Sequence, residues 1–587
     1  MTGPGSGGGA WRPPPVDTQS VLKLGRECSG DELTPSISAL CLRLVDYASV
    51  LRPEIDPEPV REWAKTCFCV WLEKLGKEND DVRKATLATD PVNLVLAARK
   101  LGDPLLTRRC LQAQMNLYSS AGMLSRINQT ILSALLEPHE PQPDPPALKD
   151  SFLPEELLAA PTPLNYAVLA LVRMRTNSSE WLPQQDDLEA LALKSAWSGD
   201  LSGVGLTLVA SADLPGSRIP DSLLLWIRRV CRTDGMFGVW QLFSENYPVA
   251  NLLSTVNIYW GLATATRGMN RAYPRPSQAG SQPSYPRPAG TSSMAVEKAI
   301  SKGQHWLDAH QDRFRLLPAC ESDLKFQSTF KPLVELSLLC YIFTRPRHIQ
   351  TRAPWSKWAL KTARRLSAHV EWEGLIEAFR LRTSATLGLV IYPFLASATG
   401  VSGHWSTEVR ELIDSPIARI QERTPMREMD YQFTRSILGL PMTREVPQQI
   451  SNTVIRKPVD AVLLDSDSLY DLTHVIFYGT QFGCTAWSPP DSEINKWLQM
   501  WLPRMALARL LMEDADLGAE LFLSGLYAFG REFDRRLIPL LLNAQRANGS
   551  FVGPDNSSDD PDEFSDSYHT TLVSMAALAE CSLYDRR

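Results

Sequence analysis

The chain has 587 residues, of which 44% are hydrophobic and 21% are charged, and its formal net charge is −6. This length exceeds the roughly 100–200 residues of a single domain, and the composition is ordinary for a globular protein with a large buried core. The acidic balance argues against a protein that coats nucleic acid, because such proteins carry a basic domain. No apolar run approaches the roughly 20 residues that cross a bilayer, so we expect no membrane span.

Residues 1–16 are rich in Gly and Pro and contain no charged stretch followed by an apolar one. This pattern predicts a disordered tail and no signal peptide. The ten cysteines are scattered and form no CxxC pair. Most of them lie in apolar helical patterns, so we expect reduced, buried thiols and a cytoplasmic protein.

The clearest boundary is the segment 269–293, which is rich in Pro, Ser and Gly. Such a composition cannot bury a core and is typical of a disordered linker. The linker divides the chain into an N-terminal domain, residues 17–268, and a C-terminal domain, residues 294–587. Its two Pro-Arg-Pro triplets are also compatible with a binding role.

Both halves show apolar residues at intervals of three and four, and alternating strand-like runs are nearly absent. The fold class predicted is therefore all-α. About a dozen helical segments are expected between Met294 and Leu572. Helices of this number, packed as antiparallel hairpins, form either an open superhelix or a closed α/α toroid.

A motif near the C-terminus favours the closed toroid over the open superhelix. Leu541, Gln545, Gly549 and Phe551 have the pattern L-x3-Q-x3-G-x-aromatic, which resembles the QW repeat of the terpenoid-cyclase and protein-prenyltransferase superfamily. The resemblance implies an α/α toroid. A simple Asn-Gly turn after a helix is the alternative explanation.

A degenerate copy of the motif occurs in the first half, where Ile227, Cys231, Gly235 and Phe237 have the same spacing. A helix rich in small residues follows each copy. We therefore expect two toroid-like domains, of which the first is degenerate. Leu253 of the first half aligns with His569 of the second, so the first half is expected to lack a site.

Seven of the eight histidines lie after the linker, which places the expected chemistry in the second half. Two segments there resemble the zinc-site segments of protein prenyltransferase β subunits. One is Asp566-Ser-Tyr-His569-Thr, where the resemblance implies that His569 is a metal ligand. The other is Tyr470-Asp471-Leu-Thr473-His474, where Asp471 matches, Thr473 stands in place of the expected Cys, and His474 could substitute.

The predicted metal ligands are thus Asp471, His474 and His569, binding a divalent cation for which zinc is expected and magnesium is the alternative. Asp471 and His474 are i and i+3 on one helix, and inner-helix N-termini of a toroid converge at one mouth. Two further explanations stay open. One is a metal-free polar pocket, and the other is Asp471 as a helix cap with both histidines in the core.

Four more residues are candidates for catalysis. Asp566 and Tyr568 precede His569 in the same segment. Glu428 and Tyr431 lie at the start of another apolar helix, and either of them could act as an acid or a base. The acidic loop 557–566 could hold Mg²⁺ with a diphosphate, although a solvated loop explains it equally well.

The leading functional hypothesis is a metal-dependent enzyme with an apolar substrate in the C-terminal toroid. The family resemblance implies transfer, cyclisation or lyase chemistry on an isoprenoid or peptide in bacterial specialised metabolism. No nucleic-acid partner is expected. The alternative is a helical-repeat binding scaffold without catalysis.

Overall fold

The structure is a computed structural model of the whole chain. In the first half it describes residues 16–19, 21–22, 26, 34–75, 162–176, 185–211, 219–231, 237 and 248–270. In the second half it describes residues 293–314, 323–381, 388–401, 403, 405–442, 445–456, 459–530, 533–553 and 563–585. Residues 1–15 of the predicted tail and 271–292 of the predicted linker lie outside these ranges.

The chain divides into two compact units, Met1–Ala279 and Gly280–Arg587. The all-α prediction is confirmed, because the described ranges contain helices and no strand. Their single β-type contact is an isolated bridge between Gln545 and Phe551. Among the described helices, none is both long enough and apolar enough to cross a membrane.

The described helices of the first unit are α2 (Thr34–Leu51), α3 (Glu58–Leu75), α10 (Pro163–Thr176), α11 (Gln185–Trp197), α12 (Leu201–Ser211), α13 (Ile219–Val230) and α14 (Pro248–Asn270). Those of the second unit are α15 (Ser293–Ala309), α16 (Asp323–Phe343), α17 (Pro346–Gln350), α18 (Pro354–His369), α19 (Trp372–Leu381), α20 (Ile391–Thr399), α21 (Ser406–Ile413), α22 (Pro416–Ile420), α23 (Pro425–Ile437), α24 (Val446–Ile450), α25 (Ser466–Gly479), α26 (Ser492–Leu511), α27 (Ala515–Phe529), α28 (Leu537–Asn543) and α29 (Glu563–Asp585).

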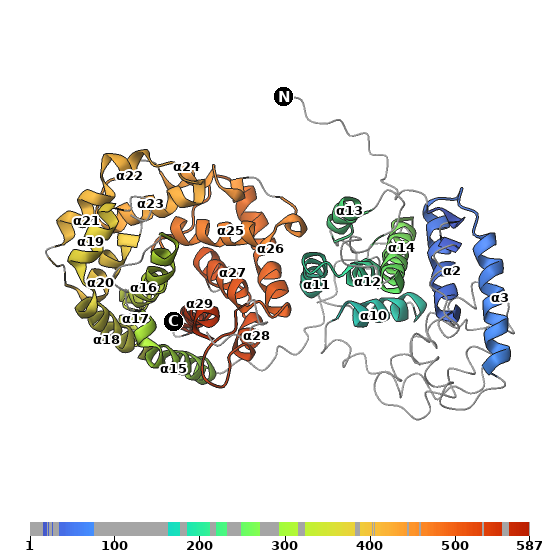
Figure 1. Cartoon of the computed structure of the whole chain (residues 1–587), viewed down its shortest axis with the longest axis horizontal. Coiled ribbons are helices and arrows are strands. Elements are labelled where there is room, and N and C mark those ends of the chain that lie inside the picture. The colour runs from blue at the N-terminus through green and yellow to red at the C-terminus, as the bar shows by residue number, and fades with distance from the viewer. Residues whose placement is uncertain are drawn as a thin grey trace, which may run out of the picture. The chain divides into compact units, whose positions relative to one another are not determined.

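In the second unit, one set of helices follows a circuit of neighbours, and other helices lie outside it (Figure 1). Helix α16 packs against α20 and α29, α27 packs against α29 and α25, and α25 packs against α23. The rings of Phe394 on α20 and Phe433 on α23, with centroids 6.2 Å apart, complete the circuit. Helices α15, α18, α26 and α28 pack against its members from the other side.

Short polar side chains fix where three of the circuit helices begin. Thr424 accepts a hydrogen bond from the Arg427 amide before α23, Asp465 accepts one from Ser468 before α25, and Asp514 accepts one from Leu517 before α27. Each cap satisfies an amide that the helix itself leaves without a partner. Because Asp465 is the residue that caps α25, Asp471 does not have the capping role considered above.

The turn after α28 contains most of the L-x3-Q-x3-G-x-aromatic motif that predicted a closed toroid. The Gln545 side-chain amide donates to the Ala299 carbonyl of α15, at 2.8 Å, and to Gly549. Phe551 is fully buried, and its amide donates to the Thr571 hydroxyl of α29 at 3.0 Å. The motif therefore connects the end of α28 to α29 and to α15, whose Ala299 is 246 residues from Gln545 in sequence.

The first unit contains the same backbone contact at the matching sequence position. The amide of the buried residue Phe237 donates to the Thr255 hydroxyl of α14 at 3.0 Å. The order of neighbours matches too. Helix α14 packs against α2 and α12, and α12 against α10, just as α29 packs against α16 and α27, and α27 against α25.

We predict that Gly549→Ala destabilises the second unit by about 1–3 kcal/mol, the usual cost of a strained backbone position. Gly549 has φ +102°, and an added Cβ would lie 2.4 Å from the Lys302 carbonyl oxygen. The measurement is denaturant-induced unfolding of the full chain. As a control, an added Cβ at the exposed Gly374 of α19 meets no atom within 4 Å, so Gly374→Ala should be neutral or slightly stabilising. Equal effects of the two substitutions would contradict this account of the turn.

Candidate functional site

A cavity of about 1080 Å³ lies inside the circuit of helices in the second unit. Helices α16, α20, α23, α25, α27 and α29 line it, together with residues 421–424. Most of the wall is apolar. Its apolar side chains include Val334, Leu338, Leu339, Ile342, Val390, Phe394, Phe433, Phe477, Phe482, Leu523, Leu572, Val573 and Ala576.

Polar side chains gather at one end of the cavity. They come from the N-terminal parts of α23, α27 and α29, from positions along α25 and from the middle of α16. Farther along α23, α27 and α29 the lining side chains are apolar. The polar lining residues on these helices are Lys331, Glu335, Arg427, Asp430, Tyr470, His474, Tyr478, Asp516, Glu520 and His569.

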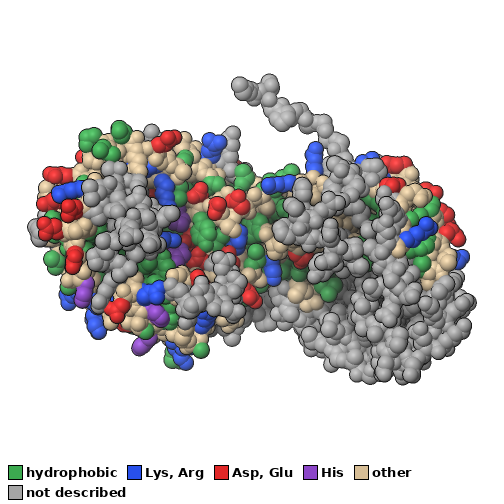
Figure 2. Space-filling model, viewed as in Figure 1, with side chains coloured by type: hydrophobic (Ala, Val, Ile, Leu, Met, Phe, Trp, Pro, Cys, Tyr) green, Lys and Arg blue, Asp and Glu red, His purple; other side chains and the backbone are tan. Residues whose placement is uncertain are grey.

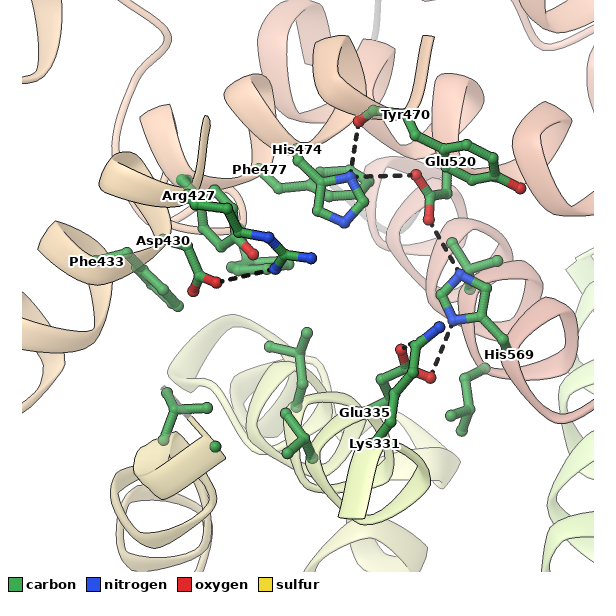
Figure 3. A pocket seen from close by; sticks show the side chains of 18 of the residues that line it. Lys331, Glu335, Arg427, Asp430, Phe433, Tyr470, His474, Phe477, Glu520 and His569 are labelled. Atoms are coloured by element: carbon green, nitrogen blue, oxygen red, sulfur yellow. Dashed lines mark hydrogen bonds and ion pairs between the residues drawn. The ribbon is translucent and has the colours of Figure 1, made fainter. Parts of the chain in front are cut away.

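His569 lies between two carboxylates at this polar end (Figure 3). Its Nδ1 is 3.1 Å from Glu335 Oε2, and its Nε2 is 3.1 Å from Glu520 Oε1. Ionised carboxylates only accept hydrogen bonds, so both ring nitrogens carry a proton and the ring is an imidazolium. Burial would lower the pKa of His569, but the negative charges of Glu335 and Asp516 and the two hydrogen bonds outweigh it and hold the pKa well above its ordinary value.

Glu520 joins His569 to the second histidine of the cavity. Its side chain is almost completely buried, and it accepts a hydrogen bond of 2.5 Å from Thr473. His474 Nδ1 lies 3.8 Å from Glu520 Oε2. Burial would raise the pKa of Glu520, but the nearby His474 and the hydrogen bonds from His569 and Thr473 outweigh it, so the pKa is lowered and the carboxylate is ionised.

The orientation of His474 is fixed by its own helix. Nδ1 is 2.7 Å from the Tyr470 carbonyl oxygen, which can only accept, so Nδ1 carries the proton. In the neutral ring Nε2 is then the acceptor. The Nε2 side of the ring points into the cavity (Figure 3), and the side chain is 29% exposed.

Asp516 is the third carboxylate near His569. It accepts hydrogen bonds from the Tyr470 hydroxyl at 2.5 Å and from the Thr570 hydroxyl at 2.7 Å. One of its oxygens lies 3.8 Å from His569 Nε2. Two hydroxyl donors therefore stabilise a buried charge that the imidazolium reaches only at longer range.

A separate acidic group, Asp430, faces the cavity from α23. Arg427 Nη1 donates to it at 3.3 Å. Burial raises the pKa of Asp430 above its ordinary value in spite of the nearby Arg427 guanidinium and His474 ring. The polar end therefore contains carboxylates whose environments shift their pKa values in opposite directions, as acid–base sites do.

In the space-filling view, acidic and basic side chains are interspersed over the described surface of the second unit (Figure 2). Neither sign dominates this face. Recognition of a charged group therefore depends on the side chains inside the cavity more than on a surface field.

The structure brings together two of the three predicted metal ligands. His474 and His569 line the same cavity and both approach Glu520. Asp471 instead lines a separate hollow beside Asn452, Thr453 and Val459. The predicted set is therefore not assembled, because the i, i+3 spacing determines neighbouring positions on a helix but not which partner each faces. Among the described residues, no group of three or more His, Cys, Asp and Glu side chains is arranged to hold a metal ion.

The four predicted catalytic residues do not reach the cavity wall. Tyr431 is buried and donates to the Ile413 carbonyl at 2.9 Å, and Glu428 pairs with Gln432 and Arg423. Asp566 is exposed. Tyr568 is buried beside Glu335, where burial and that carboxylate raise the pKa of its hydroxyl. Its hydroxyl donates a hydrogen bond to Glu335. Of the predicted acidic loop, residues 557–562 lie outside the described ranges.

Sequence reasoning missed the carboxylates that organise the site. Asp516 and Glu520 are i and i+4 in the otherwise apolar segment ADLGAELFLSGLYAF. Two carboxylates on one face of such a helix are costly to bury unless they are paired. Their position in this apolar segment could therefore have identified them as candidate site residues. Glu335 follows Lys331 by four residues in a similar apolar helix.

One protein family, described as a domain of unknown function (DUF6895), matches residues 301–579. The matched segment covers nearly all of the second unit, including every helix that lines the cavity. No curated protein and no solved structure matches the chain. The family description names no activity.

The charge pairs predict how stability depends on pH. The raised pKa of His569 stabilises the fold fully below the unfolded value of about 6.5, and this contribution is lost as pH rises through the folded pKa. The lowered pKa values of Glu335 and Glu520 stabilise above the unfolded value of about 4.3, and this is lost as pH falls through the folded values. We expect His569→Gln to cost about 1–3 kcal/mol between these limits, with the difference shrinking at both extremes.

The measurement is the free energy of unfolding of both proteins from pH 4 to pH 10. His305→Gln is the matched control, since His305 is exposed and its Nδ1 lies 2.6 Å from the Ser301 carbonyl oxygen of its own helix. A difference between wild type and His569→Gln that stays constant across the whole range would contradict the charged pairing of His569.

Proposed function

We propose that the second unit is an enzyme that binds a largely apolar small molecule in its cavity and transfers a proton at the polar end. The observation that carries the proposal is Glu520, shared between His474 and His569 at the boundary of an apolar chamber. A buried carboxylate flanked by two differently oriented histidines is an arrangement suited to acid–base catalysis.

His474 is the proposed base. Its Nδ1–H is held by the Tyr470 carbonyl, so Nε2 accepts a proton from the ligand. The new positive charge on the ring is stabilised by Glu520, 3.8 Å from Nδ1. The electron pair stays on the substrate, whose own electron-withdrawing group takes up the negative charge that develops. Return of the proton to another atom gives isomerisation, and departure of a leaving group gives elimination.

This assignment gives no ligand role to Asp471, because that residue faces another hollow. Both nitrogens of His569 are hydrogen-bonded to carboxylates, and a protonated nitrogen does not bind a metal. Proton transfer by histidine and carboxylate therefore accounts for the site as it is built, and the elimination outcome retains the lyase chemistry expected from the sequence.

The circuit of inner helices supports the further proposal that the second unit is an α/α toroid. The first unit is proposed to be a degenerate copy, supported by the matching Phe237–Thr255 and Phe551–Thr571 contacts. In that alignment Leu253 corresponds to His569. The copy would then lack the imidazolium on which the site depends.

We predict that the wild-type protein catalyses exchange of a substrate C–H for deuterium. The protein is incubated with a pool of apolar metabolites in heavy water, and mass spectrometry identifies compounds that gain deuterium. His474→Gln and Glu520→Gln should reduce the exchange at least about 100-fold, the usual contribution of a positioned acid or base.

Asp471→Asn is the matched control on the same helix and should retain full exchange, because Asp471 lies outside the cavity. A chelator should leave the exchange unchanged. Binding of apolar compounds without any exchange would contradict the enzymatic proposal and favour a binding scaffold.

A further inference from the structure

The turn that follows α25 contributes Phe482 to the wall of the cavity. Gln481, Phe482 and Gly483 have φ values of 48°, 55° and 81°. Three successive residues therefore adopt the left-handed conformation, and two of them carry side chains that disfavour it. A backbone of this kind persists only where its surroundings hold it in place.

Two arginines, one buried and one half-buried, hold the turn. Arg345, 5% exposed, donates to the carbonyl oxygens of Phe482 and Gln481. Arg347 donates to the Gly483 carbonyl at 3.3 Å. Each carbonyl that the left-handed backbone directs away from α25 thus receives a charged donor.

The second arginine is itself anchored to the last helix. Arg347 Nη2 lies 2.5 Å from Glu580 Oε1, and Glu580 is fully buried on α29. His348 Nε2 lies 3.2 Å from the same oxygen. The turn is therefore fixed to α29 through an ion pair whose carboxylate is buried and whose guanidinium is 20% exposed.

The turn also packs closely against α27. A Cβ at Gly483 would lie 2.4 Å from the Tyr527 ring. Only glycine allows this approach, and it leaves no room for the turn to shift. As a result the Phe482 side chain, 6% exposed, is directed to the cavity wall. Its ring centroid lies 5.2 Å from that of Phe433 and 5.4 Å from that of Phe477.

We propose that Phe482 forms a rigid end wall of the cavity and thereby sets the maximum length of the apolar body of the ligand. The inference rests on the proposed function, in which the ligand's reacting group lies at the polar end. The apolar remainder must then extend along the later turns of the helices toward Phe482. Length selection follows because a backbone held by Arg345, Arg347 and Glu580 cannot yield to a longer chain.

The test measures the affinity of straight-chain primary alcohols from hexanol to hexadecanol for the full-length protein by titration calorimetry. Each added methylene that enters the cavity should raise affinity about fourfold. In the wild-type protein the increase should stop at one chain length. In Phe482→Leu and Phe482→Ala the increase should continue to longer alcohols, because the end wall has been shortened.

Phe522→Leu is the matched control, since Phe522 is fully buried on α27 and does not line the cavity. It should keep the wild-type length limit. Circular dichroism and unfolding curves show whether each variant is folded, and the milder Phe482→Leu provides the test if Phe482→Ala fails to fold. An unchanged length limit in a folded Phe482 variant would overturn the inference while leaving the proposed proton transfer intact. Failure of every alcohol to bind the wild-type protein would overturn both.

Discussion

The site depends on the pairing of the His569 imidazolium with Glu335 and Glu520. Glu335, Asp516 and Glu520 surround His569 in a cavity whose wall is mostly apolar, and their charges would be costly to bury without a cation. His569 belongs to α29, and it is hydrogen-bonded to Glu335 of α16 and to Glu520 of α27. One ring therefore fixes three helices and keeps the carboxylates ionised.

This pairing also distinguishes the two histidines. His569 uses both nitrogens and is charged, whereas His474 uses only Nδ1, with the Tyr470 carbonyl, and keeps Nε2 toward the cavity. Glu520 lies beside both. The same carboxylate that holds one histidine in its charged form is in position to stabilise the other when it accepts a proton, so acid–base chemistry follows from how the charges are arranged.

The cavity is polarised along the axes of the helices. Along α23, α27 and α29 the charged side chains come first, and Phe, Leu and Val follow. A bound molecule is therefore oriented, with its polar group near the histidines and its apolar part toward the turn that contains Phe482. The Arg347–Glu580 pair holds this turn, and His569 holds the polar end, so both involve α29. The last helix thus contributes to both ends of the chamber.

Periodicity predicted an all-α protein, and the resemblance to prenyltransferase zinc-site segments predicted that His474 and His569 share a site. Periodicity also selected the correct helix around residues 427–433, but Arg427 and Asp430 face the cavity where Glu428 and Tyr431 were expected. An offset of one residue turns a helical side chain by about 100°, and only the neighbours decide which stripe faces inward. Likewise, Asp471 and His474 are one turn apart on the same helix, yet Asp471 lies beside the segment that contains Asn452, whereas His474 faces the cavity. The carboxylate partners of His569 come from helices 49 and 234 residues away in sequence, so no local pattern identified them.

The protonation state of the two cavity histidines tests the central claim most directly. Nitrogen NMR of the full-length protein with labelled imidazole rings reports both ring nitrogens of each histidine, and His569→Gln and His474→Gln assign the signals. At pH 7.5 the account predicts that His569 carries protons on both nitrogens, and that the neutral form of His474 carries its proton on Nδ1. A neutral His569 at this pH, titrating at or below the ordinary value of about 6.5, would contradict the account.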